Sequence, residues 1–220
     1  MSSPVIPLPK IILEGTHLTR KTDIAFLLAE HPRLVGKRKH RWHIPLVSSE
    51  WETLSEATPT KASPGNSMID FLPHQEDWAM ESYQTYMRLF ELNRDYYWIV
   101  DRFHISTISR QQAETGRLYD FSWLEKRLKA LNFFMVQTVR SAETFEKARE
   151  DRLVYSENPH RYTNLHKFVH EQEVLRNLMA DSLLPTLEVD VSDDDIERAA
   201  NEILDWVEGN GGFWDRPWAA

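Results

Sequence analysis

The stretch KIILEGTHLTRKTDIA, residues 10–25, decides the fold. Its apolar run at 11–13 suits a strand that is buried on both faces. A turn follows that ends at Lys21 and Thr22, and the next apolar residues recur at helical spacing. A strand, a turn ending in Lys-Thr and a helix are the context in which a phosphate-binding loop is expected.

The chemistry of such a loop depends on three kinds of group. Backbone N–H groups at the start of a helix bind an anion, a lysine spans the β and γ phosphates, and a hydroxyl holds Mg²⁺. Lys21 and Thr22 supply the last two groups. The usual pattern has glycine where this chain has Arg20, which either strains the turn or adds a phosphate contact. The alternative is an ordinary strand-to-helix turn with an accidental Lys-Thr.

Composition limits the class of protein. The 220 residues fit one domain, or one domain with an inserted lid, and 41% hydrophobic residues suffice for a large core. A net charge of −8 argues against a general nucleic-acid binder, and the lack of cysteine excludes disulfides and thiol chemistry. No apolar run has the length of a membrane span, and MSSPVIPLP does not read as a secretory signal. We therefore expect a cytoplasmic protein that binds neither a nucleic acid polymer nor a membrane.

Strands and helices alternate along the rest of the chain. Apolar runs predict strands at 96–100, 133–139 and 185–191. Helical spacing predicts helices at 21–30, 75–93, 121–131, 165–179 and 196–207, and the polar stretch 103–112 is expected to be a helix or a turn. Ser141 and Ser192 are expected to cap helices that follow them. This order predicts a three-layer α/β/α fold with a parallel sheet. We expect a single domain over 1–220, with a long loop region on the substrate side at 36–75 and a lid at 149–162.

Polar residues follow the strand at 96–100 directly. Asp101 and Arg102 would lie at the carboxyl end of a buried strand, where ligands bind in open α/β sheets, although a surface ion pair is the alternative. On the helix at 75–93, Gln84 and Arg88 share a face, which suits a planar aromatic ligand. The aromatic residues of that helix are equally explained by core packing.

Arginines cluster in and after the helix that begins near residue 141. Arg149, Arg152 and Arg161 would lie on a segment suited to charge stabilisation during phosphoryl transfer. An exposed helix surface is the alternative for any one of them.

Several motifs resemble those of thymidylate kinases. EGTHLTRKTDIA is similar to their loop E-G-x-D-G-x-G-K-[ST], and DRFHISTISRQ is similar to their signature D-R-[YF]-x-x-S-x-x-A-Y-Q. EVLRNLMADSLLPTLEVDVSDDDIERAANEILDWV is similar to the closing helix–strand–helix of that family, and DWAMESYQTYMRL resembles a helix of the related deoxyribonucleoside kinases. The matches cover most of the chain in the right order. They imply a P-loop nucleoside/nucleotide kinase fold with a helical lid.

The resemblance implies ATP- and Mg²⁺-dependent phosphoryl transfer to a nucleoside, a nucleoside monophosphate or a related small hydroxyl compound. It implies catalytic roles for Lys21, Asp101 and Arg102, and a metal held by Thr22 and Asp101. The donor nucleotide would be held by Gly15, Thr16, Arg20, Lys21, Thr22, Arg149 and Arg152, with Arg161 as a further lid arginine. The acceptor would be held by Trp78, Gln84, Arg88, Arg102, Phe103, Ser106 and Gln111. A homodimer is also expected, because dimers are common in that family.

The chain departs from the family at several positions. His17 replaces the loop aspartate, and Leu18 and Arg20 replace loop glycines. Arg110 replaces the tyrosine of the A-Y-Q signature. The carboxylate that deoxyribonucleoside kinases place after the second strand is absent near 44–45. The alternative to an active kinase is therefore a catalytically weak relative that binds a nucleotide for regulation or structure.

Overall fold

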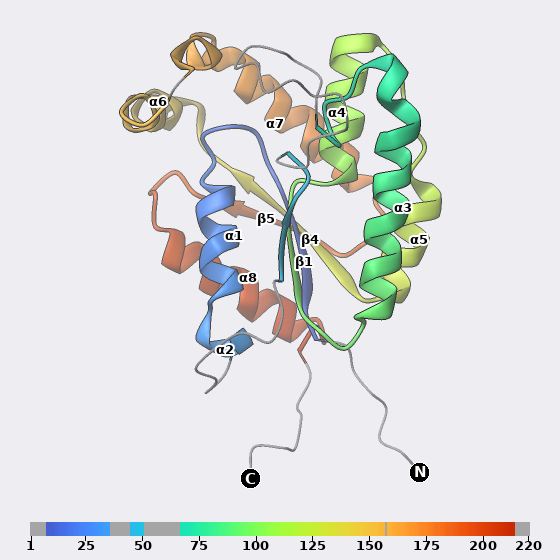
Figure 1. The fold of residues 1–220 in the computed structure, drawn as a ribbon. Coiled ribbons are helices and arrows are strands. Elements are labelled where there is room, and N and C mark those ends of the chain that lie inside the picture. Colours follow the sequence, from blue (N-terminus) through green and yellow to red (C-terminus); the bar gives the residue numbers. More distant parts are fainter. Residues whose placement is uncertain (1–7, 36–44, 51–66, 157, 214–220) are drawn as a thin grey trace, which may run out of the picture.

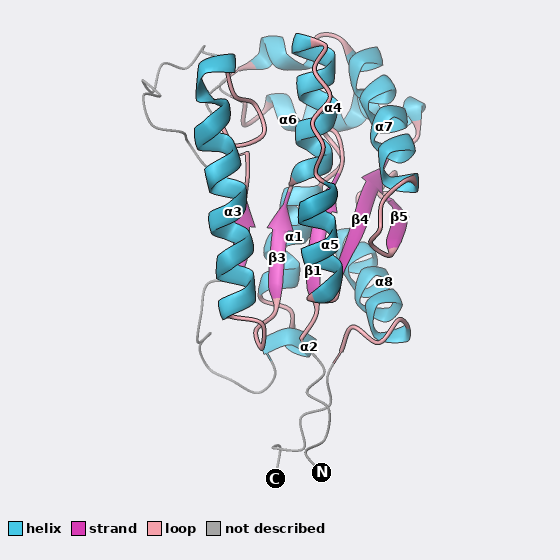
Figure 2. Cartoon of the chain, turned by 90° about the vertical axis from the view of Figure 1, so that its right-hand side faces the viewer, coloured by secondary structure: helices cyan, strands magenta, loops and turns pink. Residues whose placement is uncertain are grey.

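The computed structural model describes residues 8–35, 45–50, 67–156 and 158–213. In this part of the chain five parallel strands form one sheet in the order β2-β3-β1-β4-β5. The strands are β1 Lys10–Glu14, β2 Leu46–Ser48, β3 Trp98–Asp101, β4 Phe133–Val139 and β5 Thr186–Asp190. All five run in the same direction, so their carboxyl ends meet at one edge of the sheet, which is uppermost in Figures 1 and 2.

Helices cover both faces of the sheet. The helices of one face are α1 Lys21–Ala29 and α8 Ile196–Gly209, with the short α2 Pro32–Val35 below α1. Those of the other face are α3 Glu76–Leu92, α4 His104–Thr115, α5 Ser122–Ala130 and α7 Leu165–Ala180 (Figure 2). α6 Phe145–Leu153 lies above the carboxyl edge, and the 3₁₀ turns are η1 Pro73–Gln75, η2 Ala142–Thr144 and η3 Pro159–Tyr162. The predicted three-layer α/β/α fold is therefore confirmed.

The apolar core has two halves because alternate residues of a strand point to opposite faces. Ile11 and Leu13 pack with α1 and α8, whereas Ile12 packs with the helices of the other face. All three side chains are fully buried. This burial explains why β1 reads as a continuous apolar run rather than as an alternating one.

Three local predictions need correction. The predicted loop region 36–75 contains strand β2, which has only three residues and gives no clear periodic signal; 36–44 and 51–66 lie outside the described residues. Ser192 does not cap the last helix, because Asp195 accepts the hydrogen bond from the Arg198 backbone N–H at 2.9 Å. Ser141 precedes η2 but makes no side-chain capping bond.

A buried polar cluster joins α4, α5 and the segment after α7. The Glu125 carboxylate accepts from His104 Nε2 at 3.0 Å, from the Ser182 hydroxyl at 2.7 Å and from the Leu183 backbone N–H at 2.9 Å. Burial would raise the pKa of Glu125, but these hydrogen bonds outweigh it and lower the pKa to about 2.

We expect Glu125→Gln to lower the free energy of unfolding at pH 7 by about 2 kcal/mol, because hydrogen bonds to a charged group are lost. The folded-state pKa lies below the ordinary value of 4.5, so this stabilisation is complete above about pH 5 and fades as the pH falls towards 2. Urea unfolding between pH 3 and 7 measures it, with Glu81→Gln on the exposed side of α3 as the control. A difference between wild type and Glu125→Gln that grows on acidification would contradict the assignment.

No helix within the described ranges combines the length and the apolar character needed to cross a bilayer.

Candidate functional site

The turn between β1 and α1 is packed tightly against β4. Gly15 has a φ of +154°, and a Cβ atom built there would lie 2.5 Å from Thr138 Oγ1 and 2.9 Å from Thr19 Oγ1. The Thr138 hydroxyl in turn donates to Thr19 Oγ1 at 2.9 Å. Only glycine fits at position 15, so this residue fixes where the turn begins.

Two side chains occupy positions where the resembled loop has glycine. Leu18 has a φ of 70° and Arg20 a φ of 56°, both in the left-handed region that favours glycine. The expected strain at Arg20 is therefore present. Two contacts partly offset the backbone strain at Leu18. Its side chain packs against the cluster of Phe145, Tyr162 and Phe168, and its carbonyl accepts a hydrogen bond from Arg140 Nε at 3.0 Å.

Arg20→Gly is expected to be more stable than Arg20→Ala by about 1 kcal/mol, because alanine keeps the left-handed strain and glycine removes it. Both substitutions remove the same guanidinium, so their difference isolates the backbone. The midpoints of urea unfolding for the two variants measure it. Equal stability, or a more stable alanine variant, would show that the turn carries no strain at this residue.

Lys21, Thr22 and Asp101 meet at the carboxyl edge of the sheet. The Thr22 hydroxyl, in the first turn of α1, donates to Asp101 Oδ2 at 2.7 Å at the end of β3. Lys21 is 5% exposed and interacts electrostatically with Asp101, Arg102 and Glu50. Burial, followed by the charge of Arg102, lowers the pKa of Lys21, while Asp101 and Glu50 oppose that shift. The sequence predicted that residues at the start of α1 and at the end of β3 would meet at this edge.

The residues present fit a Mg²⁺ ion held together with phosphate oxygens. Asp101 Oδ1 is buried and has no hydrogen-bond partner, while Oδ2 binds the Thr22 hydroxyl. One carboxylate and one hydroxyl are the protein ligands that such an ion takes in phosphate-binding loops. Among the described residues no cluster of three or more His, Asp or Glu side chains could hold a metal ion, so phosphate and water would have to complete the coordination.

Arg102 is fully buried and links Glu50, Ser106 and Glu171. Its Nε lies 3.1 Å from Glu50 Oε2, and its Nη1 donates to the Ser106 hydroxyl at 3.2 Å and lies 3.8 Å from Glu171. The backbone of Arg102 is also left-handed, with a φ of 61°. Nη2 is buried without a hydrogen-bond partner. An uncommon backbone conformation and an unused donor are features that cluster at functional sites.

Glu50 is a carboxylate of the site that the sequence analysis did not single out. It lies just beyond Ser49, which follows β2, and its Oε1 lies 3.6 Å from Arg110, 3.7 Å from Arg161 and 3.8 Å from His17. Burial would raise the pKa of Glu50, but the cationic charges of Arg102 and Lys21 outweigh burial and hold it well below 4.5. Glu50 is therefore ionised at neutral pH.

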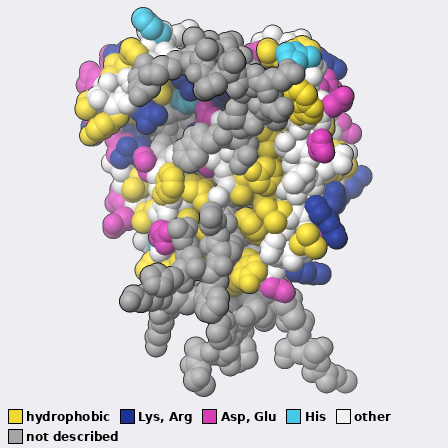
Figure 3. Space-filling model, viewed as in Figure 1, with side chains coloured by type: hydrophobic (Ala, Val, Ile, Leu, Met, Phe, Trp, Pro, Cys, Tyr) yellow, Lys and Arg dark blue, Asp and Glu magenta, His cyan; other side chains and the backbone are white. Residues whose placement is uncertain are grey.

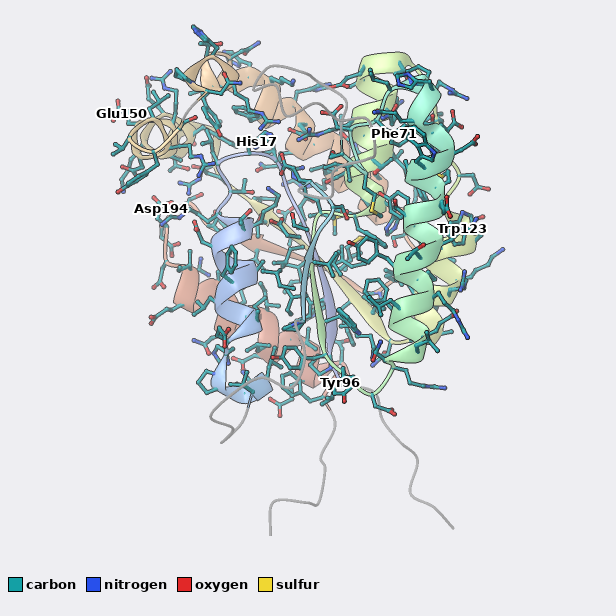
Figure 4. The ribbon with its side chains drawn as sticks, in the orientation of Figure 1. His17, Phe71, Tyr96, Trp123, Glu150 and Asp194 are labelled. Atoms are coloured by element: carbon teal, nitrogen blue, oxygen red, sulfur yellow. The ribbon has the colours of Figure 1, made fainter. Side chains whose placement is uncertain are left out.

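His17 takes the place of the loop aspartate as a neutral ring. Burial and the charge of Arg102 lower its pKa well below 6.5. Its Nε2 accepts a hydrogen bond from Arg110 Nη2 at 3.2 Å, which places the ring proton on Nδ1. Tyr162 and Phe168 contact the ring edge-to-face, with centroids 6.2 and 5.6 Å away. His17 lies between α1 and the helices above the sheet (Figure 4).

A cavity of about 660 Å³ lies above this edge of the sheet. Residues 17–23 line it, together with Glu50, Ser67, Asp70, Arg110 and Asp194. Arg110 lies 3.6 Å from both Glu50 and Asp70, so these residues share one side of the cavity. Figure 3 shows basic and acidic side chains side by side in the upper left of one face, where α6 and the start of α1 lie. The volume suits a nucleotide-sized ligand.

The predicted lid segment lines the cavity, but only two of its three arginines do so. Arg152 and Arg161 line it, together with Tyr155 and Tyr162, and Arg152 Nε donates to the Tyr162 hydroxyl at 3.2 Å. Arg149 instead pairs with Glu146 at 2.8 Å on α6 and does not line this cavity. Arg149 and Arg152 are three residues apart on α6, and only the Arg152 side chain reaches the cavity.

The predicted donor residues are placed unequally around the cavity. Arg20, Lys21 and Thr22 line it, and Arg20 also lies 3.3 Å from Asp23. Gly15 and Thr16, at the start of the loop, do not line the cavity, and the buried Thr16 hydroxyl donates to Glu171 at 2.5 Å.

The side chains predicted to hold the acceptor do not line this cavity, and Arg102 is linked to it only through its contact with Glu50. Gln84 is exposed, and Arg88 is exposed and pairs with Glu91, since α3 turns its other side into the core. The remaining side chains are in protein contacts: Trp78 packs beside Phe71, Phe103 is fully buried, Ser106 binds Glu14 and Arg102, and Gln111 Nε2 donates to the Phe71 carbonyl at 3.0 Å.

Known proteins resemble this chain in fold, at low sequence identity. No family model and no curated protein matches the chain. The YorR protein of Bacillus subtilis, solved with phosphorylated GDP, matches with a TM-score of 0.61 and 16% identity over 94% of this chain and 99% of that one. Deoxyadenosine kinase of M. mycoides with bound dATP matches with a TM-score of 0.53 and 10% identity over 90% of this chain and 99% of that one. The chain thus has the α/β fold of P-loop kinases.

Proposed function

We propose that this protein is an ATP- and Mg²⁺-dependent phosphotransferase that acts on the hydroxyl of a small molecule. The observation that carries the proposal is that Lys21 and Thr22 line one cavity and that the Thr22 hydroxyl lies 2.7 Å from the buried Asp101 carboxylate behind them. The fold likeness to kinases, including structures solved with bound nucleotides, supports it.

The donor phosphates would lie over the first turn of α1. No side chain caps this helix, so its first N–H groups are left for an anion, which the positive end of the helix dipole also favours. Lys21 would bind the β and γ oxygens, and the phosphate charge would stabilise its protonated form against burial. Thr22 and Asp101 would hold Mg²⁺, which neutralises phosphate charge when bound.

The acceptor hydroxyl would lie beside Glu50. An ionised carboxylate at this position accepts the hydroxyl hydrogen and orients the oxygen for attack. Arg102 positions Glu50 through their 3.1 Å contact. Arg152, on the lid side of the cavity, would bind an oxygen of the transferring phosphoryl group.

A catalytically weak relative is the second candidate, and the left-handed Leu18 and Arg20 favour it. Side chains at these positions reduce the room for backbone N–H groups to approach a phosphate. Such a protein would still bind a nucleotide but would not transfer its phosphate.

Two calorimetric titrations and one turnover assay separate the candidates. We expect Mg²⁺–ATP to bind saturably and ADP to compete for the same site. Release of ADP on adding a small hydroxyl compound then identifies the active kinase, and binding without any release across an acceptor screen identifies the weak relative. No heat with either nucleotide would contradict both.

A further inference from the structure

The space that the resemblance reserves for a nucleobase is filled by the protein itself. Residues 67–71 run along the α3–α4 side of the site, and Met68, Ile69 and Phe71 are at most 3% exposed. The Gln111 amide that would read a base donates to the backbone carbonyl of Phe71 at 3.0 Å. Figure 4 labels Phe71 beside α3 and α4. A buried hydrogen bond and three buried side chains would have to be displaced before a base could enter.

The part of the cavity next to Glu50 is lined mainly by charged and polar side chains, whereas Tyr155 and Tyr162 lie on its lid side. In the described residues its wall on this side consists of His17, Glu50, Ser67, Asp70, Arg110 and Arg161. A nucleobase binds most readily against aromatic faces and apolar surface. A wall of charged and hydroxyl groups favours a smaller, polar acceptor.

Two arginines on this wall have donors to spare. Arg110, on α4, lies 3.6 Å from both Glu50 and Asp70, and Arg161, in η3, lies 3.7 Å from Glu50. These distances exceed a hydrogen bond, so the carboxylates balance charge without using the N–H groups. Arg110 Nη2 donates to His17 at 3.2 Å, which leaves Arg110 Nε and Nη1 for a ligand. The Arg110 side chain is 12% exposed and that of Arg161 46% exposed. Guanidinium groups with free donors bind carboxylate or phosphate in a planar, two-point manner.

We propose that the acceptor is a small hydroxyl compound without a nucleobase, whose anionic group binds Arg110 and Arg161 while its hydroxyl faces Glu50. This inference rests on the proposed function, because it names the acceptor of that same site. The anionic group is a carboxylate or a phosphate, which share the chemistry that a guanidinium recognises.

The test uses protein saturated with Mg²⁺ and the non-hydrolysable ATP analogue AMP-PNP, so that the donor site is already occupied. Inorganic phosphate and acetate are then titrated as the two anion probes, and thymidine and deoxyadenosine as neutral nucleosides. We expect at least one anion to bind saturably with a millimolar dissociation constant. Arg110→Gln and Arg161→Gln should each weaken that binding about tenfold or more, because each removes a charge-assisted contact.

Arg176→Gln is the matched control, since Arg176 pairs with Glu173 and Glu188 away from the cavity. Arg161→Gln keeps the test decisive if Arg110→Gln does not fold, because Arg161 is half exposed. The proposal is overturned by saturable nucleoside binding, by no anion binding, or by anion binding that survives both substitutions.

The loading step separates this inference from the proposed function. If AMP-PNP does not bind, the proposed function fails. The anions are then titrated into the unloaded Lys21→Ala protein, in which Arg110 and Arg161 remain. Anion binding that both arginine substitutions weaken supports the anion site even then, and its absence overturns it.

Discussion

Lys21→Ala is expected to reduce phosphoryl transfer at least about 100-fold and to weaken Mg²⁺–ATP binding at least about tenfold. The ammonium is buried at the cavity wall, where a contact with the phosphates is poorly screened by solvent. Transfer is measured as ADP release with an acceptor found by screening, and affinity by calorimetry.

Two further variants make this result specific. Lys21→Met keeps the apolar stem and should lose activity to the same extent, so that packing is excluded as the cause. Lys129→Ala, on the exposed side of α5, should leave both quantities unchanged. Retention of more than about a tenth of the wild-type rate in Lys21→Met would rule out a phosphate contact for this lysine.

Glu50→Gln should lower the transfer rate about 100-fold while changing the affinity for Mg²⁺–ATP by less than about threefold. The amide keeps the size of the side chain but does not accept a proton from the acceptor hydroxyl. Because the pKa of Glu50 is held well below 4.5, the carboxylate stays ionised from pH 5 to 8, and we expect no acid limb from it in that range. The rate is measured as ADP release across this pH range.

Glu50→Asp is the conservative partner of this variant and should recover part of the lost rate, because it restores a carboxylate at a shorter reach. Glu81→Gln is the distant control. If Glu50→Gln lost rate and nucleotide affinity in equal proportion, Glu50 would be supporting Arg102 and the cavity wall rather than acting on the acceptor.

The sequence was most informative where one short segment carries the whole signal. Each of three signals depends only on neighbours in the chain: the apolar run of β1, the Lys-Thr turn, and Asp101-Arg102 at the end of β3. Parallel strands then bring the ends of β1 and β3 together. The structure places Lys21, Thr22 and Asp101 side by side as predicted. The positive φ at Arg20 was likewise foreseeable, because a glycine position follows from the loop pattern.

The residues on the acceptor side of the site could not be predicted from local sequence patterns. Glu50 follows a strand of three residues, too short for a periodic signal, and its importance appears only when Arg102, Arg110 and Arg161 converge on it. Gln111 has the residue type expected for reading a base, yet its partner is a carbonyl 40 positions away in the chain. Such long-range pairings depend on packing that no local pattern reports.

Phosphorus-31 NMR of bound Mg²⁺–AMP-PNP tests most directly whether the loop after β1 is a phosphate site. We predict that wild-type protein shifts and broadens the β and γ resonances, and that Lys21→Ala largely abolishes both changes at the same nucleotide concentration. Unperturbed resonances with wild-type protein, or identical perturbations with both proteins, would contradict the account.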